Sequence, residues 1–512
     1  MTGLTFLDDT SAPWNRRFWL LLAGVFIFRA CFTVFFCAHA DLAGDEAYYW
    51  DWGRRLDWGY YSKPPMIGWL MGLVGWLTGA CDIGIRMTAL TLGTLTLAAL
   101  FLLMRRLYDA RTGFLAALLV LLTPANTGLN LFLTIDAPLL LCWSLALLLF
   151  WMAAEKPECG WRWTALTAVI GLGALSKQMM LVFPVLMVLF SFVSGQDRGL
   201  LSRPGLWLSI LGGASFLIPV LLWQQRHDWI TLEHTAHHFD TKSLGLGGWL
   251  VRSLEWPGVQ ALVYSPVLWA AMVLILVFGV TRWGRMGRRE RYLLITSAPA
   301  LGVFTLLALR QRINPNWPAV FWVPALLLVA AWFAGHLPRP GMPSWRRWAM
   351  RSAFAVVALA HGVVPAVLLT SLKGHKKLAE LRGWRETGKQ AGRFLDQAPR
   401  PGNTFVLALG HRYNAAQMAF NMPQHPRVYR FESSGRPMSQ YEIWPGPEER
   451  IGDDALIFTS KGLPPAVAGC FESVEKRGRV EVPLGDETRF YDVHLGVRLK
   501  KWGMVAQPIL KP

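Results

Sequence analysis

The sequence predicts a polytopic α-helical membrane protein that carries a small α/β domain at its C-terminal end. Composition is the first reason: 16% of the 512 residues are charged, 53% are hydrophobic and the mean hydropathy is +0.32. A soluble domain carries about 25% charged residues. The second reason is a series of long apolar runs, and the third is a change to globular composition after residue 372.

The apolar runs number eleven, and most are long enough to cross a bilayer. About 20 helical residues, rising 1.5 Å each, cover ~30 Å of hydrocarbon. The runs at 113–125 and 164–176 are the shortest. The expected spans are 18–38, 84–104, 113–125, 131–152, 164–176, 178–195, 205–223, 260–280, 292–309, 318–336 and 350–371.

The net charge of +18, from 51 Lys and Arg against 33 Asp and Glu, reports topology. The basic residues gather in every second loop, as at Arg16–Arg17, Arg105–Arg106 and Arg288–Arg289. That alternation is the positive-inside pattern, so nucleic acid is not an expected partner. With Arg16 and Arg17 in the cytoplasm, eleven spans place the C-terminus outside.

Two long loops then lie on the outer side, at 39–83 and 224–259. The first contains an apolar run, Pro65–Gly79, whose length of about 15 residues suits a helix lying on the membrane surface. We therefore expect a transmembrane domain over residues 1–371, including both loops, and an extramembrane domain over 372–512.

The region 372–512 predicts alternating strands and helices. The expected strands are Thr404–Ala408, Arg427–Phe431, Ala455–Thr459, Arg479–Val482 and Arg489–Val493, and the expected helices are Glu380–Asp396 and Asn414–Phe420. No Walker or dinucleotide-binding glycine motif occurs in it.

The first outer loop contains the adjacent acids Asp45 and Glu46, followed by Tyr48. Carboxylates at a bilayer surface can act as a general base or bind a cation. The alternative is that they open a helix, because acids in a first turn favour the helix dipole. Both interpretations stay open.

A lysine follows in the same loop, within Tyr60-Tyr61-Ser62-Lys63-Pro64-Pro65. Lys63 can bind a phosphate as a point charge, and the prolines fix the backbone that presents it. The alternative is an interfacial lysine whose charge reaches the headgroups.

Two further charges stand at the outer ends of spans. Asp136, in Thr134-Ile135-Asp136-Ala137-Pro138, either caps its helix or carries function, because acids near lipid are functional candidates. Lys177 lies at the outer end of an apolar hairpin.

The last outer loops carry histidines and arginines. His234 and His238 have the i, i+4 spacing of metal ligands, but the HExxH order is absent. We expect this loop to contact a phosphate or sugar, and a divalent cation is the alternative. Arg310 and Arg312 precede the tenth span, where two arginines can bind an anionic lipid headgroup; the alternative is a plain interfacial anchor.

Together these residues resemble the GT-C glycosyltransferases, and most of all the bacterial branch related to lipid A aminoarabinose transferase and the protein O-mannosyltransferases. The resemblance covers about residues 20–370 and is strongest in 40–180. Asp45-Glu46 matches the acidic motif of the first loop, Lys63-Pro64-Pro65 the lysine–proline element near the donor phosphate, Asp136 the second acidic position and Ser176-Lys177 a later lysine motif.

The sequence departs from this family in two respects. It predicts eleven spans where the aminoarabinose enzymes have thirteen, and it shows no clear acceptor-site signature. Two segments resemble the soluble domain of a bacterial subgroup: His411-Arg412-Tyr413 and Ser439-Gln440-Tyr441-Glu442-Ile443-Trp444. This resemblance gives their residues no role.

The resemblance implies an inverting transfer on the outer face of a bacterial inner membrane, from a polyprenyl-phosphate sugar to lipid A, another glycan or a protein. Asp45 would be the general base, with Glu46 and Asp136 orienting the base or the acceptor. Lys63, Lys177, Arg310 and Arg312 would bind the donor phosphate. Tyr48, Tyr61, His234 and His238 are candidates for substrate contact. No cofactor is implied with certainty.

A transporter or flippase for a glycolipid is the competing class. Transporters commonly show repeated halves and midplane charges. Here the ionisable residues gather at outer ends and no repeat is visible, which favours the glycosyltransferase. A sensor would leave the acidic first loop unexplained.

Overall fold

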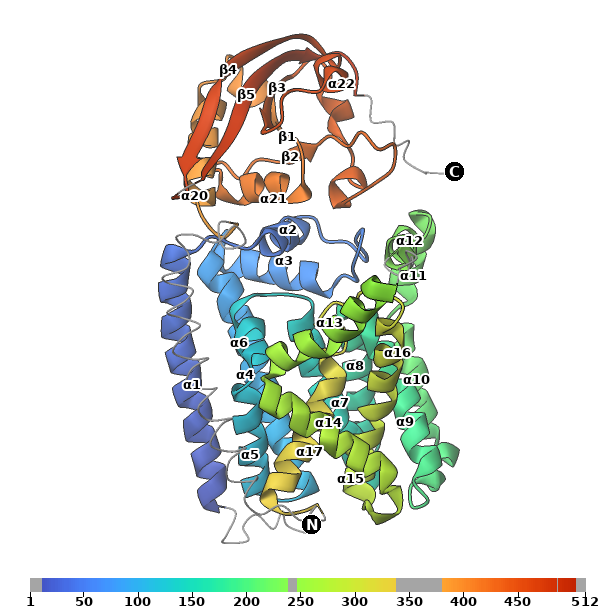
Figure 1. The fold of residues 1–512 in the computed structure, drawn as a ribbon. Coiled ribbons are helices and arrows are strands. Elements are labelled where there is room, and N and C mark those ends of the chain that lie inside the picture. Colours follow the sequence, from blue (N-terminus) through green and yellow to red (C-terminus); the bar gives the residue numbers. More distant parts are fainter. Residues whose placement is uncertain (1–11, 238–245, 338–379, 486, 503–512) are drawn as a thin grey trace. The chain divides into compact units, whose positions relative to one another are not determined.

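The computed structural model describes residues 12–237, 246–337, 380–485 and 487–502, and the chain divides into two compact units (Figure 1). The helical unit comprises Met1–Phe32, Arg86–Val220 and Ala236–Val364. The C-terminal unit comprises Thr33–Ile85, Leu221–Thr235 and Pro365–Pro512, so the expected loop 39–83 clusters with the C-terminal residues.

Ten of the eleven expected spans are helical in the described residues; the eleventh, 350–371, lies outside them. Of the described helices, five are individually long and apolar enough to cross a membrane, or seven if each of two bent pairs is one span. The helices at the ten described positions are α1 (Ala12–His39), α4 (Asp82–Leu107), α5 (Ala110–Leu121), α6 (Pro124–Leu131), α7 (Asp136–Glu155), α8 (Gly160–Ser176), α9 (Val182–Val193), α10 (Pro204–Ser215), α11 (Ile218–Arg226), α13 (Leu246–Tyr264), α14 (Pro266–Thr281), α15 (Arg288–Ile295), α16 (Ala298–Ala308) and α17 (Ala319–Ala334).

Both bent pairs break at a proline. Helices α5 and α6 meet at 73° before Pro124, and α13 and α14 meet at 112° before Pro266. Proline lacks an amide hydrogen and disfavours helical backbone in the residue before it. The hydroxyls of Thr123 and Ser265 then cap the second helix of each pair. The expected span over 260–280 therefore corresponds mainly to the second helix of its pair, which begins at Pro266, and its first residues belong to the preceding helix.

The core of the helical unit lies around α7 and α17, whose side chains are buried along most of their length. The Trp143 ring of α7 makes edge-on contacts with Phe183 and Phe321, each 5.1 Å away between ring centroids. In a bilayer, such close packing replaces the hydrophobic effect as the main force between helices.

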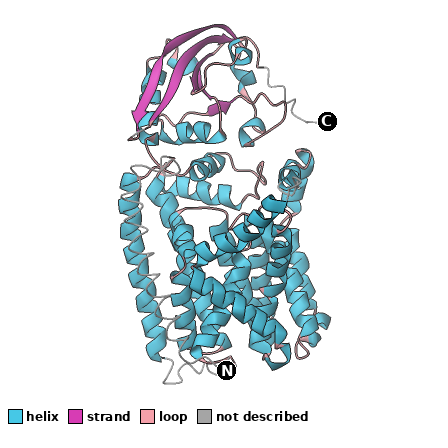
Figure 2. Cartoon of the chain, in the orientation of Figure 1, coloured by secondary structure: helices cyan, strands magenta, loops and turns pink. Residues whose placement is uncertain are grey.

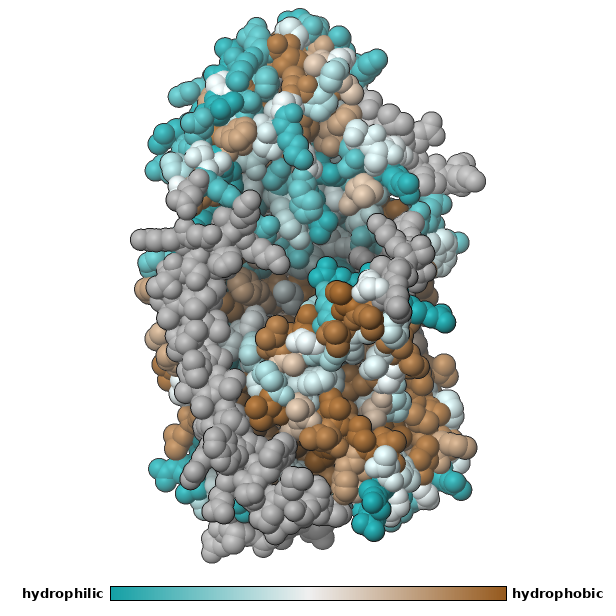
Figure 3. All heavy atoms as spheres, in the orientation of Figure 1, coloured by the Kyte–Doolittle hydropathy of each residue, from teal (hydrophilic) through white to brown (hydrophobic). Residues whose placement is uncertain are grey.

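The outward faces of the same unit stay apolar. In Figure 3, hydrophobic side chains gather over α13 and α14, where Leu254, Leu262, Leu274 and Val277 are exposed. A soluble protein rarely exposes so continuous an apolar surface, so this face suits contact with lipid.

The C-terminal unit contains a five-stranded sheet in the order β2-β1-β3-β5-β4 (Figure 2). Strands β1 (Thr404–Ala408), β2 (Val428–Arg430) and β3 (Asp454–Thr459) are parallel, and β4 (Phe471–Pro483) and β5 (Thr488–Leu499) add an antiparallel hairpin. All five expected strands are confirmed. The hairpin is longer than expected because one face of β4 is charged and exposed, which hides it from an apolar pattern.

Helices α20 (Trp384–Asp396) and α21 (Arg412–Asn421) pack against the sheet and against each other, and both were expected. A second apolar cluster, which includes Phe405, Ile457 and Phe471, fills the opposite face beside α22 (Pro465–Ala468). The domain is thus an α/β layer arrangement built on alternating strand side chains.

The same unit also contains α2 (Gly44–Gly53) and α3 (Met66–Thr78), which pack on each other. The run Pro65–Gly79 does form a helix, and Trp76 and Leu77 on it are exposed. The expected loop 224–259 is largely helical where it is described: it holds the end of α11, α12 (Ile230–His237) and most of α13. These helices were not predicted, because the many polar residues of this segment mask an apolar pattern.

Candidate active site

Helix α2 begins at the acidic motif, because a side chain of its own first turn caps its N-terminal end. Ala43 is extended, and Glu46 accepts a hydrogen bond from the Ala43 amide at 3.0 Å. Glu46 is 1% exposed, so its carboxylate is committed to the helix terminus. The helix-start interpretation of this motif therefore applies to Glu46.

Asp45 differs from its neighbour, because 48% of its side chain is exposed. One oxygen, Oδ1, accepts a hydrogen bond from the Tyr413 hydroxyl at 2.8 Å and lies 3.8 Å from the Arg412 guanidinium. Among the described residues, Oδ2 accepts no hydrogen bond. A half-exposed carboxylate with one free oxygen at a helix N-terminus can accept a proton from a ligand.

A third acid of α2, Asp51, has no exposed side-chain surface. It accepts a hydrogen bond from the Tyr441 hydroxyl at 2.8 Å and pairs with Arg54 at 3.3 Å. No role for Asp51 was predicted from the sequence. Its position between Trp50 and Trp52 was the available signal, because an acid within an aromatic run must find partners when it is buried.

The Lys63 segment is fixed to α2 by its aromatic neighbour. The Tyr60 ring is fully buried and stacks on Trp52 at 4.4 Å between centroids. The Tyr60 amide donates to the Lys63 carbonyl at 3.1 Å, which closes a turn before the buried Pro64. The lysine side chain is half-buried. This hydrogen bond ties the Lys63 backbone to Tyr60, next to the two prolines.

Gln440 joins the two candidate tyrosines. Its amide donates to the Tyr48 hydroxyl at 2.6 Å, and its side-chain oxygen accepts from the Tyr61 amide at 2.6 Å. Burial raises the pKa of both phenols, so each stays protonated at neutral pH. Tyr48 is therefore a buried structural link, and the Tyr61 ring lies 4.7 Å from the His234 ring.

Residues 221–235 join this cluster through two hydrogen bonds. The Trp223 indole donates to Asp57 at 2.7 Å, and the Thr231 hydroxyl donates to the Tyr60 carbonyl at 2.8 Å. His238 lies outside the described residues. Within the described ranges, no three His, Cys, Asp or Glu side chains are grouped to hold a metal ion.

In the helical unit, Asp136 and Lys177 form a buried ion pair. The Lys177 ammonium lies 2.8 Å from Asp136 Oδ1, and the two side chains are 11% and 6% exposed. The Asn316 amide donates to Oδ2 at 2.6 Å. Asp136 does not cap its helix, so that alternative is wrong: Ile135 occupies the cap position without a side-chain bond. Lys177 reaches it because the chain is extended there, between α8 and the following turn.

Arg310 and Arg312 lie in the same unit, and Arg312 lines a small cavity of about 180 Å³. Arg312 pairs with Glu255 at 2.8 Å, and 74% of its side chain is exposed. Gln311 also lines this cavity and is buried, with no hydrogen-bond partner for its Nε2 atom in the described structure. An exposed ion pair holds its arginine weakly, so Arg312 can turn toward an anion.

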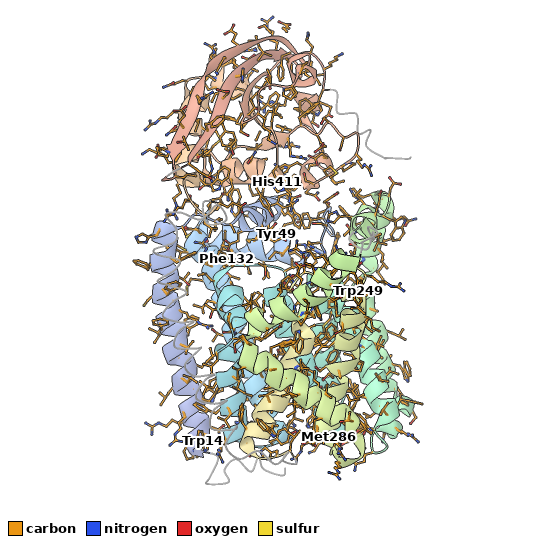
Figure 4. The ribbon with its side chains drawn as sticks, in the orientation of Figure 1. Trp14, Tyr49, Phe132, Trp249, Met286 and His411 are labelled. Atoms are coloured by element: carbon orange, nitrogen blue, oxygen red, sulfur yellow. The ribbon has the colours of Figure 1, made fainter. Side chains whose placement is uncertain are left out.

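The predicted residues thus fall into separate groups. The C-terminal unit brings together Asp45, Tyr48, Tyr61, His234 and the Lys63 turn, and the helical unit brings Asp136 to Lys177. The contribution of the C-terminal domain was missed, because nothing in the local pattern of 411–413 or 439–444 indicates contact with residues 44–61. Figure 4 labels Tyr49 on α2 and His411 at the start of α21, two helices that pack together.

The comparisons with known proteins all find glycosyltransferases. Residues 62–223 match the dolichyl-phosphate-mannose-protein mannosyltransferase family. The lipid A galacturonosyltransferase RgtD of Rhizobium johnstonii is 28% identical over 423 residues, which cover 78% of this chain and 82% of the relative.

Two solved structures share the fold. ArnT from Cupriavidus metallidurans bound to undecaprenyl phosphate has a TM-score of 0.60 at 18% identity, covering 96% of this chain and 99% of ArnT. The apo oligosaccharyltransferase of Archaeoglobus fulgidus has a TM-score of 0.51 at 13% identity, covering 85% and 67% of the two chains.

Proposed function

We propose that this chain transfers a sugar from a polyprenyl phosphate to an acceptor hydroxyl. It is a multi-pass membrane glycosyltransferase of the GT-C type, related to ArnT and to the protein mannosyltransferases. The donor class is supported by the polyprenyl phosphate named for ArnT. Lipid A is the first acceptor to test, because RgtD acts on it; another glycan or a protein is the alternative.

The observation that carries the chemistry is the difference between the three acids of α2. Glu46 and Asp51 are buried and engaged with other groups, whereas Asp45 is half-exposed with Oδ2 unbonded among the described residues. A general base needs an oxygen within reach of the proton that it removes. Asp45 is the acid of α2 that meets that requirement.

The reaction proceeds by single displacement with inversion. The acceptor oxygen attacks the anomeric carbon as its proton passes to Asp45. The bond between that carbon and the phosphate oxygen breaks, and polyprenyl phosphate leaves with the electron pair. Positive groups must stabilise the charge that develops on this phosphate.

Lys63 and the arginines of the 310–312 segment are assigned to the departing phosphate. Lys63 sits on a rigid turn, and Arg312 is exposed enough to leave its partner Glu255. Lys177 is the further candidate for the phosphate, but its charge is paired with Asp136 in the helical unit, so we expect a smaller contribution from it. Glu46 acts indirectly, through the α2 terminus.

The membrane orientation follows from the basic clusters. The N-terminus lies in the cytoplasm, and the C-terminal domain lies in the periplasm of a bacterial cell with an inner membrane. No nucleotide sugar is available there, which accounts for a lipid-linked donor.

The test is transfer of radiolabelled sugar from extracted polyprenyl-phosphate-sugar pools to envelope fractions by the protein in reconstituted membranes. Asp45→Asn is compared with the wild type and with Asp396→Asn, which changes an exposed carboxylate of α20. We expect the wild type and Asp396→Asn to label one envelope fraction, which identifies the acceptor. Asp45→Asn should label no fraction.

Transfer that survives in Asp45→Asn would reject Asp45 as the base. An absence of transfer from every pool by a folded wild type would reject the glycosyl transfer itself and favour a flippase or transporter.

A further inference from the structure

We propose that Tyr413 and Arg412 of the C-terminal domain are positioning residues of the reaction site, which hold the Asp45 carboxylate in one orientation. This inference rests on the proposed function of Asp45. It makes the C-terminal domain part of the catalytic apparatus, although its residues follow Asp45 by more than 360 positions.

The direction of the hydrogen bond defines the role of Tyr413. An ionised carboxylate has acceptors only, so the Tyr413 hydroxyl must donate to Oδ1 at 2.8 Å. Burial and the charge of Asp45 raise the pKa of the Tyr413 phenol, which keeps the donor protonated. The bond fixes Oδ1 and leaves Oδ2 for the acceptor hydroxyl.

Arg412 holds the same oxygen by charge. Its guanidinium lies 3.8 Å from Oδ1 and over the rings of Tyr48 and Tyr413, at 5.4 and 4.9 Å from their centroids. Such cation–π contacts orient an arginine without neutralising it. Burial and the neighbouring Arg412 lower the pKa of His411, so the imidazole is neutral near pH 7 and Arg412 supplies the positive charge of this segment.

The backbone of α2 is shaped for this contact. A β carbon at Gly44 would collide with the Tyr413 ring, so the ring lies directly on the first turn of the helix. Only glycine permits this approach at the residue before Asp45.

The segment Ser439–Trp444 fixes the domain to the same helix. The Tyr441 hydroxyl reaches Asp51, the Gln440 amide reaches Tyr48, and the Arg55 guanidinium lies 4.1 Å from the Trp444 ring centroid. With α2 held at several points along its length, the Tyr413 hydroxyl cannot drift from the carboxylate. Rigid support of this kind is what a catalytic group requires.

The experiment measures kcat and KM for Tyr413→Phe in the reconstituted full-length protein. The phenylalanine keeps the ring against Gly44 and removes only the hydroxyl. Tyr491→Phe is the matched control: it removes a tyrosine hydroxyl of the same domain that donates to Asn414 of α21 at 3.1 Å and not to Asp45.

We expect Tyr413→Phe to lower kcat by about 10- to 100-fold with KM changed less than threefold, because misplacement of a catalytic group by about 1 Å costs that much. Arg412→Gln should lower kcat in the same way, and Tyr491→Phe should leave both constants unchanged. Equal thermal unfolding midpoints exclude a folding defect.

The inference fails if Tyr413→Phe keeps kcat within twofold of the wild type, or if Tyr491→Phe loses as much. The variant Asp45→Asn distinguishes a failure of this positioning role from a failure of the proposed function. An inactive Asp45→Asn beside an active Tyr413→Phe rejects only the positioning role, whereas an active Asp45→Asn rejects the base as well.

Discussion

Replacing Lys177 by methionine would leave the Asp136 carboxylate buried with Asn316 as its remaining partner. The charges lie 2.8 Å apart, and with an effective dielectric constant of about 20 their attraction amounts to about 6 kcal/mol. Desolvation of both groups offsets part of this gain. Removing one partner of such a pair costs about 3–5 kcal/mol of unfolding free energy, because a buried charge is left uncompensated.

The exposed pair Arg106–Glu155 supplies a matched control in the same unit. Its atoms lie 2.6 Å apart, but the side chains are 36% and 28% exposed, so Arg106→Met should cost at most about 1 kcal/mol. The double variant Lys177→Met/Asp136→Asn should recover most of the loss, because the uncompensated charge is gone. Equilibrium unfolding in mixed detergent micelles, followed by tryptophan fluorescence, measures all of these variants. The reasoning is refuted if Lys177→Met loses no more than Arg106→Met, or if the double variant is no more stable than Lys177→Met.

Glu46→Gln keeps an oxygen for the α2 terminus, so we expect initial transfer rates within tenfold of the wild type, against a loss of about 10²- to 10⁴-fold for Asp45→Asn; equal losses would contradict the distinct roles. Tyr441→Phe removes the donor to the buried Asp51 and should lower the free energy of unfolding by about 1–3 kcal/mol in a denaturant titration, and an unchanged midpoint would count against that bond. Hydrogen bonds from Arg479 and a neighbouring lysine lower the pKa of Asp492 to about 2. The folded value lies below the ordinary carboxyl pKa of about 4, so this stabilisation is present above pH 4 and is lost as the pH falls toward 2. Thermal midpoints between pH 6 and 2.5 should fall less steeply for Asp492→Asn than for the wild type, and parallel curves would show that the pair contributes nothing.

The positions of the helices and strands were predictable, because hydropathy and side-chain alternation are local properties. The expected strand Thr404–Ala408 matches β1 residue for residue, and the expected span 84–104 lies within α4. The break at Ser265 was missed although Pro266 marks it, since the apolar run continues across the proline.

The candidate acids were also found from sequence, because charged residues are conspicuous beside apolar spans. The sequence did not distinguish the roles of these acids from one another. Asp45, Glu46 and Asp51 lie within one short helix, and only their partners distinguish an exposed base from a helix cap and a buried anchor.

The sequence alone determined a multi-pass protein with an α/β C-terminal domain and acidic loops between its apolar runs, because each of these follows from composition within about 20 residues. Tertiary structure alone decided that Tyr413 meets Asp45, that Gln440 links Tyr48 to the Lys63 turn, and that Lys177 neutralises Asp136. These pairs are separated by 41 to 392 residues, so they depend on how whole helices pack. Packing is a property of complementary surfaces, and no local pattern along the chain records it.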